Sequence, residues 1–91
     1  MASSPSSEEQ PAFFVYLVEC ADGSLYCGIA KDVERRIERH NEGKGARYTR
    51  GRRPVALVGQ AGPFAWGEAL RLERELKARR RAEKLRVFSE G

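Results

Sequence analysis

The sequence has 91 residues, of which 41% are hydrophobic; this suffices for one domain with a small core and excludes a second domain. It carries 17 Lys and Arg against 13 Asp and Glu, and all 17 basic residues lie between Lys31 and Arg86. No stretch approaches the length of a membrane-spanning segment, which excludes an integral membrane protein.

Cysteine usage and the N-terminus predict a cytoplasmic protein. No apolar signal segment is present, and Cys20 and Cys27 flank an expected turn, so we expect free, half-buried thiols rather than a disulfide. Two cysteines and one histidine at irregular spacing match no recognisable set of zinc ligands.

The chain is expected to open with a tail and a hairpin. Residues 1–11 are rich in Ser, Pro and Glu without apolar periodicity, which predicts a disordered tail. Phe13–Cys20 is aromatic and β-branched and predicts a strand, residues 21–24 supply turn chemistry, and Leu25–Gly28 returns as a second strand. Gly28 is expected to let the chain leave the sheet.

A helix follows the hairpin. Asp32 is a good N-cap, and the helix is expected to run to about Asn41–Glu42, where Gly43 can supply a left-handed stop. Val33 and Ile37 form its apolar stripe. Arg36 and His40 are four apart and therefore stack on one face beside that stripe.

Other charged residues of this helix are expected to lie at the solvated surface. Arg35 and Arg39 belong to this group, together with Glu34, Glu38 and Glu42, with which they can form surface ion pairs of little energetic weight.

The C-terminal half predicts one strand and two helices. Residues 54–59 read as a third strand, with Pro54 at its first position, where it costs no important ladder hydrogen bond. A helix is expected from Phe64 or Ala65 through about Ala78, with Ala69, Leu72 and Leu76 as its buried row. A short helix over Ala82–Phe88 is expected to fold Leu85 and Phe88 back onto the core.

Residues 43–53 form a Gly-rich loop with five positive charges and no acid. A loop of one charge sign that also contains an aromatic residue favours nucleic acid over a merely solubilising surface. The residues predicted to bind nucleic acid are Lys31, Lys44, Arg47, Tyr48, Arg50, Arg52, Arg53, Arg79, Arg80 and Arg81.

Five residues are candidates for chemistry, and each has a structural alternative. Tyr16 and Tyr26 can be cross-strand neighbours if they share a sheet face, although strand tyrosines often serve core packing. Arg36 lies near the sheet, where its fork can hold a phosphate. His40 can act as an acid, a base or a helix cap, and Glu73 can hold a divalent cation or pair with Lys77.

These residues and their spacing resemble the GIY-YIG nuclease superfamily, and in particular small stand-alone bacterial proteins with little beyond the domain. The resemblance covers roughly residues 13–88. The first motif is Phe14-Val15-Tyr16 and the second is Tyr26-Cys27-Gly28, with Phe14 where the motif name has glycine and Cys27 where it has isoleucine. Residues 29–40 are similar to the family's helix, and residues 68–77 to its carboxylate helix.

The resemblance implies an α/β fold with a three-stranded antiparallel sheet flanked by helices, formed by a domain over residues 12–88. It also implies metal-dependent hydrolysis of DNA phosphodiesters with one Mg²⁺ or Mn²⁺. By position, Tyr16 and Tyr26 match the motif tyrosines, and Arg36 matches the catalytic arginine. His40 matches the helix histidine and Glu73 the metal ligand; Tyr16, Tyr26 and His40 all stay open as the proton acceptor.

Two functions are therefore weighed. The first is a weakly sequence-selective endonuclease with a role in DNA repair or processing, and the second is a non-catalytic nucleic-acid-binding or recruitment module. The expected partner is DNA, with RNA left open, and we expect a monomer, with a protein partner possible. A further interpretation, pairing through Phe64 and Trp66, is weaker than their packing against the second long helix.

Overall fold

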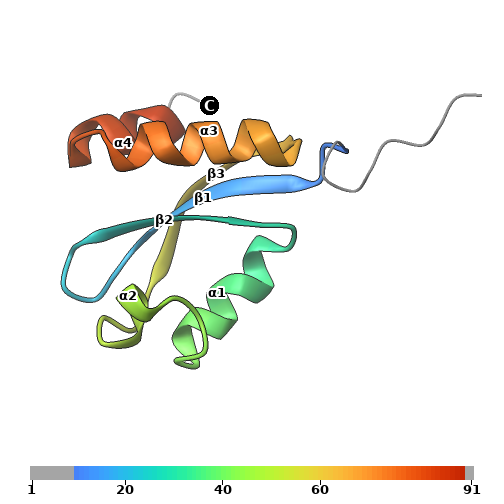
Figure 1. Cartoon of the computed structure of the whole chain (residues 1–91). Coiled ribbons are helices and arrows are strands. Elements are labelled where there is room, and N and C mark those ends of the chain that lie inside the picture. The colour runs from blue at the N-terminus through green and yellow to red at the C-terminus, as the bar shows by residue number, and fades with distance from the viewer. Residues whose placement is uncertain (1–9, 90–91) are drawn as a thin grey trace, which may run out of the picture.

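The computed structural model describes residues 10–89. They form a three-stranded antiparallel sheet in the order β2-β1-β3 with helices on both faces (Figure 1). The predicted tail falls almost entirely on residues 1–9, which lie outside the described residues. The elements are β1 (Phe13–Glu19), β2 (Leu25–Ala30), α1 (Val33–Asn41), α2 (Arg47–Arg50), β3 (Ala56–Phe64), α3 (Trp66–Lys77) and α4 (Arg81–Ser89).

The central strand β1 is buried on both faces. Val15 and Leu17 point to the side of α3 and α4, while Tyr16 and Val18 point to the side of α1, and none of the four is exposed to solvent. Successive strand residues alternate between faces, so one short strand supplies two cores. Figure 1 shows α3 and α4 on one side of the sheet and α1 and α2 on the other.

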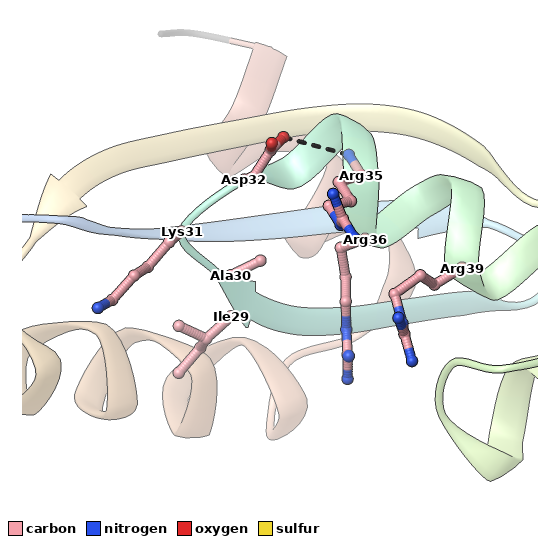
Figure 2. A pocket seen from close by; sticks show the side chains of 7 residues that line it. All are labelled: Ile29, Ala30, Lys31, Asp32, Arg35, Arg36 and Arg39. Atoms are coloured by element: carbon pink, nitrogen blue, oxygen red, sulfur yellow. Dashed lines mark hydrogen bonds between the residues drawn. The ribbon is translucent and has the colours of Figure 1, made fainter.

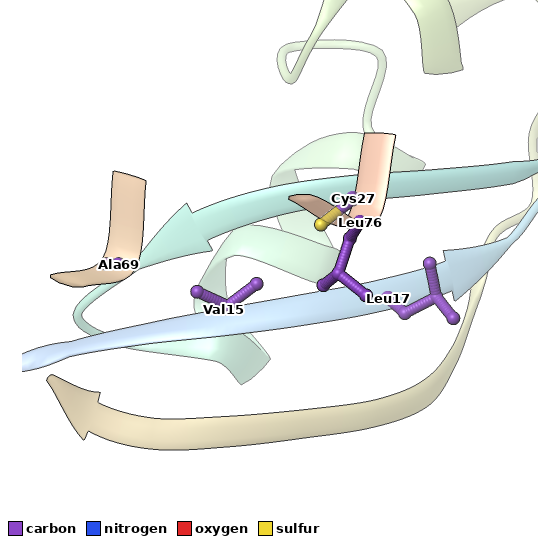
Figure 3. Close-up of a cluster of buried hydrophobic side chains, with 5 residues drawn as sticks. All are labelled: Val15, Leu17, Cys27, Ala69 and Leu76. Carbon is purple, nitrogen blue, oxygen red and sulfur yellow. The ribbon is translucent and has the colours of Figure 1, made fainter. Parts of the chain in front are cut away.

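The core beneath α3 is aliphatic. Ala69 and Leu76 are fully buried against Val15, Leu17 and Cys27, as Figure 3 shows, and Leu72, Leu85 and Phe88 pack around them. The predicted buried row of this helix is thereby confirmed, and so is the folding back of the last helix.

The two thiols are free and lie in different cores. Cys27 belongs to the cluster under α3, whereas Cys20 packs with Tyr16 and Val18 on the opposite face. The prediction of free thiols is confirmed, although both side chains are buried rather than half-buried.

Helix α1 begins and ends as predicted. The Asp32 carboxylate accepts a hydrogen bond from the Arg35 amide at 3.2 Å, and Gly43 has a φ of 82°, a conformation that favours glycine just after a helix. Val33 is buried and Ile37 packs against the same core. These anchors fix which residues of α1 face the sheet.

The predicted bounds of two strands were wrong. β2 continues to Ala30, so Gly28 lies inside the strand opposite Tyr16 and is not the point of exit. β3 runs over Ala56–Phe64 rather than 54–59, because irregularities in its register let pairing with β1 continue past Pro63. Since β3 pairs only with β1, Pro63 sits on an edge strand, where a missing amide is tolerated.

The basic loop also contains a helical turn, α2, that sequence patterning missed. None of the helices within residues 10–89 has the length and apolar character needed to cross a bilayer.

Candidate active site

Tyr16 and Tyr26 lie on the α1 face of the sheet. Tyr16 pairs with Gly28 across the strands and Tyr26 pairs with Val18, so the two phenols are diagonal neighbours with ring centroids 6.4 Å apart. The condition for the two tyrosines to be neighbours, a shared sheet face, is therefore met. Tyr16 is wholly buried and Tyr26 is half-buried, so of the two phenols only Tyr26 is partly open to solvent.

His40 is fully buried beside Tyr16. The Tyr16 hydroxyl lies 2.8 Å from His40 Nε2, and the imidazole rests against the rings of both Tyr16 and Tyr26. The Ala46 amide donates to His40 Nδ1 at 3.3 Å. An amide can only donate, so Nδ1 is the unprotonated nitrogen, and Nε2–H donates to the Tyr16 oxygen.

Thr49 completes the surroundings of the imidazole. Its buried hydroxyl lies 2.8 Å from His40 Nδ1 and 2.9 Å from the Ala46 carbonyl, so it has one proton to share between two acceptors. Both imidazole nitrogens are therefore engaged, and His40 has no lone pair left to take a proton from another group.

Burial lowers the pKa of His40, and the Arg36 guanidinium lowers it further. The unfolded chain therefore binds a proton at a higher pH than the folded protein. Stability is at its full value above the unfolded pKa of about 6.5 and falls as the pH drops below it, until the folded pKa is passed.

Because His40 is the single histidine, its titration can be followed without overlap. We expect the imidazole Cε1–H resonance to titrate with a midpoint below that of the urea-unfolded chain. The melting temperature should fall between about pH 7 and pH 5.5, a range in which carboxylates change little because their ordinary pKa lies near about 4. A folded midpoint at or above the unfolded one would contradict the neutral, buried imidazole.

Burial lowers the pKa of His40 but raises the pKa of the two phenols. It raises the pKa of Tyr16 to about 12, although the hydrogen bond from Arg36 lowers it. Burial also raises the pKa of Tyr26, where Lys77 and Arg36 act downwards and Glu73 acts upwards. Without further positive charge, Tyr16 is protonated at neutral pH.

Arg36 reaches from α1 across the edge of the sheet towards these phenols. Its side chain is half-buried, and its Nε is buried without a hydrogen-bond partner. No carboxylate within the described residues forms an ion pair with it. Figure 2 shows Arg36 beside Arg39, both extending from α1 over β2.

Glu73 approaches from the other side of β2. Its carboxylate is 18% exposed and lies 3.6 Å from the ammonium of Lys77, so the predicted helical pair is present. The same carboxylate raises the pKa of both Tyr26 and Cys27, so its charge acts on two residues of β2. Within residues 10–89, no three His, Cys, Asp or Glu gather into a group that could hold a metal.

Sequence reasoning missed two supports of this site. Thr49 binds His40, and Tyr48 stacks on Tyr26 at 5.8 Å while Arg52 lies 4.0 Å above the Tyr48 ring. Tyr48 was predicted to bind nucleic acid, and its ring is occupied by these two neighbours. The one available signal was the placement of Tyr48 and Thr49 next to each other in an otherwise basic loop.

Several of the predicted nucleic-acid ligands are engaged within the protein. Arg52 pairs with Asp22 at 2.9 Å, Arg53 donates to the carbonyls of Arg50 and Asn41, and Arg81 binds Glu19 and the carbonyl of Gly23. Lys31 lies over the Phe13 ring, and Lys44 is 3.6 Å from Glu42. Arg47, Arg50, Arg79 and Arg80 are exposed.

The fold and these residues define a GIY-YIG domain, and the chain belongs to that family: residues 12–86 match the GIY-YIG catalytic domain. Both the family and the fold class predicted from the sequence are confirmed. Membership places the protein in a nuclease superfamily, whose members act on nucleic acid and generally use divalent metal ions.

Within the family, the chain is similar to small proteins designated UPF0213. It is 54% identical over 77 residues to a UPF0213 protein of Staphylococcus aureus strain N315, covering 85% of this chain and 94% of the relative. Identity to a UPF0213 protein of Staphylococcus saprophyticus is 53% over 78 residues, covering 86% and 95%. The solution NMR structure of a UPF0213 protein from Bacillus halodurans is 47% identical, with a TM-score of 0.52 over 82% of this chain and 80% of the other.

Proposed function

We propose that this protein is a metal-dependent endonuclease that hydrolyses DNA phosphodiester bonds with little sequence selectivity. The observation that carries the proposal is the gathering of Tyr16, His40 and Arg36 beside Tyr26 on one face of the hairpin. A purely structural core does not need two phenols, an imidazole and a guanidinium without an acidic partner at one place.

In this proposal a phenolate, at Tyr16 or at Tyr26, accepts the proton of the attacking water and becomes a phenol. His40 acts through Tyr16, because its Nε2–H donates to the phenolic oxygen and its Nδ1 is occupied. A phenolate at Tyr16 would receive hydrogen bonds from both His40 and Arg36, which stabilise the deprotonated form. Cleavage by Tyr16→Phe and by Tyr26→Phe, compared at several pH values, separates the two phenols as proton acceptor.

Arg36 stabilises the charge that develops on the non-bridging phosphate oxygens. Its guanidinium carries no ion pair within the described residues, so the donors that do not bind Tyr16 are available to a phosphate, and the buried Nε still lacks an acceptor. A planar guanidinium that is already held in place needs little reorganisation when charge develops on the phosphate oxygens.

The carboxylate of Glu73 is the kind of oxygen ligand that a hard divalent cation such as Mg²⁺ or Mn²⁺ prefers. Mg²⁺ is usually held by one or two carboxylates together with substrate phosphates, and does not require a full protein cage. Glu73 is the carboxylate, and its contact with Lys77 at 3.6 Å is long for a charge-assisted hydrogen bond, which is about 2.7–2.9 Å. Such an ion, when bound, stabilises charge on the leaving 3′ oxygen.

Glu73→Gln is expected to lower metal-dependent nicking by about 10²-fold or more, because the amide keeps the shape of the carboxylate but loses its charge. The measurement compares branched, single-stranded and duplex DNA with Mg²⁺, Mn²⁺ or EDTA. Glu75→Gln on the exposed side of α3 is the matched control and should cleave as the wild type does. Equal residual cleavage in all variants would indicate a contaminating nuclease.

A second function is favoured by one observation. Glu73 already has a cationic partner in Lys77, whose ammonium lies 3.6 Å from the carboxylate. A nucleic-acid-binding module without turnover would show salt-sensitive binding that Glu73→Gln leaves unaltered, and no cleavage with any metal.

We further propose that residues 12–88 form the catalytic domain and that it acts as a cytoplasmic monomer in DNA repair or processing. Exposed basic residues such as Arg47, Arg50, Arg79 and Arg80 bind flanking phosphates without reading bases. Parallel nicking assays with RNA of the same sequence test the choice of nucleic acid.

A further inference from the structure

We infer that a cavity between the end of β2 and α1, next to Arg36, is a second phosphate subsite that binds a backbone phosphate adjacent to the one being cut. The inference rests on the proposed function and deepens it, because it states where the substrate strand leaves the catalytic centre. Arg35 and Arg39, which sequence patterning assigned to an ordinary solvated surface, are its principal ligands.

The cavity lies where β2 ends and α1 begins. It is an open hollow of about 340 Å³, which is enough for a sugar-phosphate unit, and Figure 2 shows the residues that line it. Ile29 and Ala30 are its apolar lining residues, and the others are charged. The lining residues are Ile29, Ala30, Lys31, Asp32, Arg35, Arg36 and Arg39.

Among residues 10–89, the guanidiniums around this cavity form no ion pair with an acid, although acids are close in sequence. Arg35 and Arg39 are each within one helical turn of Glu34, Glu38 or Glu42, yet none of these pairs forms in the described structure. Glu42 lies 3.6 Å from Lys44 instead. The expected surface ion pairs of this helix are therefore absent.

Three guanidiniums on one cavity repel one another. Arg35 and Arg39 are four residues apart on one helix face, an arrangement of like charges that destabilises a helix. The single acid of the lining, Asp32, is occupied as the helix cap, where it accepts from the Arg35 amide. A phosphate dianion or diester in the cavity would relieve this repulsion, and charge-assisted bonds from arginine suit its oxygens.

Arg36 connects the cavity with the catalytic centre. It lines the cavity, hydrogen-bonds Tyr16, and keeps a buried Nε without a partner. Because Arg36 borders both the cavity and the catalytic centre, the two phosphates that it contacts would be neighbours along one DNA strand. The DNA strand would pass along α1, on the side of the cavity. Several cations of the loop 43–53 are less available to it, because they bind other parts of the protein.

The test is the double substitution Arg35→Gln/Arg39→Gln, which leaves Arg36 in place. Its matched control is Arg71→Gln/Arg74→Gln, which removes two exposed guanidiniums from α3. Binding of a single-stranded oligonucleotide is measured in EDTA as a function of salt. We expect the first double variant to bind roughly tenfold more weakly and to lose about 0.7 from the salt slope, the value for one phosphate contact on a single strand, while the control keeps the wild-type slope.

A second measurement does not depend on cleavage. Inorganic phosphate is titrated into the wild-type protein while the side-chain Nε–H resonances of its arginines are followed by NMR. Shifts at Arg35 and Arg39 with none at Arg71 and Arg74 support the subsite. Equal behaviour of the two double variants in the salt titration, or phosphate shifts spread evenly over all four arginines, would overturn it.

Failure of the proposed function has a different signature. If no variant cleaves with any metal, but the cavity variant alone loses affinity and the phosphate shifts persist, the nuclease proposal fails and the phosphate site stands. If the wild type and both double variants cleave with the same KM and kcat, the nuclease stands and the subsite is refuted.

Discussion

Replacing Arg36 by alanine is expected to lower the single-turnover rate of DNA cleavage by about 10²–10³-fold, the effect of removing a preorganised donor from a developing oxyanion. The fold should persist, because the substitution breaks no ion pair within the described residues and removes a buried Nε that has no hydrogen-bond partner, so that only the hydrogen bond to Tyr16 is lost. The rate is measured with DNA already bound, so that weaker binding does not enter the comparison.

The same substitution has a second readout that needs no nucleic acid. The Arg36 guanidinium lowers the pKa of both His40 and Tyr16. In Arg36→Ala the midpoint of the His40 Cε1–H titration should therefore move upwards, towards the value of the unfolded chain. Loss of cleavage together with this shift connects the chemical effect to the described geometry.

Two further variants serve as controls. Arg36→Lys keeps the charge but loses the planar fork, so cleavage should recover only in part. Arg74→Ala removes an exposed arginine of α3 and should change neither rate nor titration. Wild-type cleavage in Arg36→Ala with an unmoved His40 midpoint would refute the role assigned to this guanidinium.

The parts of the site that the sequence predicts are those set by local periodicity. The four-residue spacing of Arg36 and His40 fixes their common helix face once Asp32 and Gly43 mark the helix ends. Strand alternation and the short turn bring Tyr16 and Tyr26 to one face of the hairpin. These relations need only a helix and a hairpin, and no knowledge of how the two pack.

The parts that the sequence does not predict depend on contacts between distant segments. Thr49 reaches His40 through α2, a single helical turn that propensity cannot distinguish from loop in a run of Arg and Gly. β3 extends beyond its expected end because irregular pairing with β1 carries it past Pro63. Likewise, α3 periodicity puts Glu73 beside the apolar row, but only the packing of α3 on β2 brings its charge to Tyr26.

Arg35 and Arg39 show the limit of pattern reasoning in charged helices. Glutamates at pairing distance along the helix predict surface ion pairs, and both arginines are indeed exposed. In the structure these pairs do not form, and the guanidiniums border a cavity formed with the end of β2. The lining of a cavity depends on the angle between a helix and a strand, which helical periodicity does not specify.

Gly28→Ala is expected to abolish the arrangement of Tyr16 and His40. Gly28 lies opposite Tyr16 in the β1–β2 pair, and a methyl group there would lie 2.6 Å from Tyr16 Cζ and closer still to its hydroxyl oxygen. Tyr16 cannot yield easily, because it is wholly buried and bonded to His40. We expect a stability loss of about 1–3 kcal/mol, typical of overpacking, and at least a roughly 10²-fold loss of cleavage from misplacement of the phenol.

Chemical denaturation and the single-turnover rate measure these two effects, and Gly51→Ala is the control. An added Cβ at Gly51 meets nothing within 4 Å, and its φ of −92° suits alanine, so stability and rate should stay near the wild-type values. If Gly28→Ala were as stable and as active as Gly51→Ala, the close approach of the Tyr16 phenol to the β2 backbone would be refuted.

Adding Tyr16→Phe to Gly28→Ala separates crowding from chemistry. The tightest contact of the new methyl is with the Tyr16 hydroxyl, so its removal should restore part of the lost stability, whereas the remaining contact with Cζ keeps the recovery incomplete. Cleavage should not recover, because the double variant has no hydroxyl to accept from His40. Recovery of both stability and cleavage would mean that Tyr16 serves only to fill the core, and that the chemistry belongs to Tyr26.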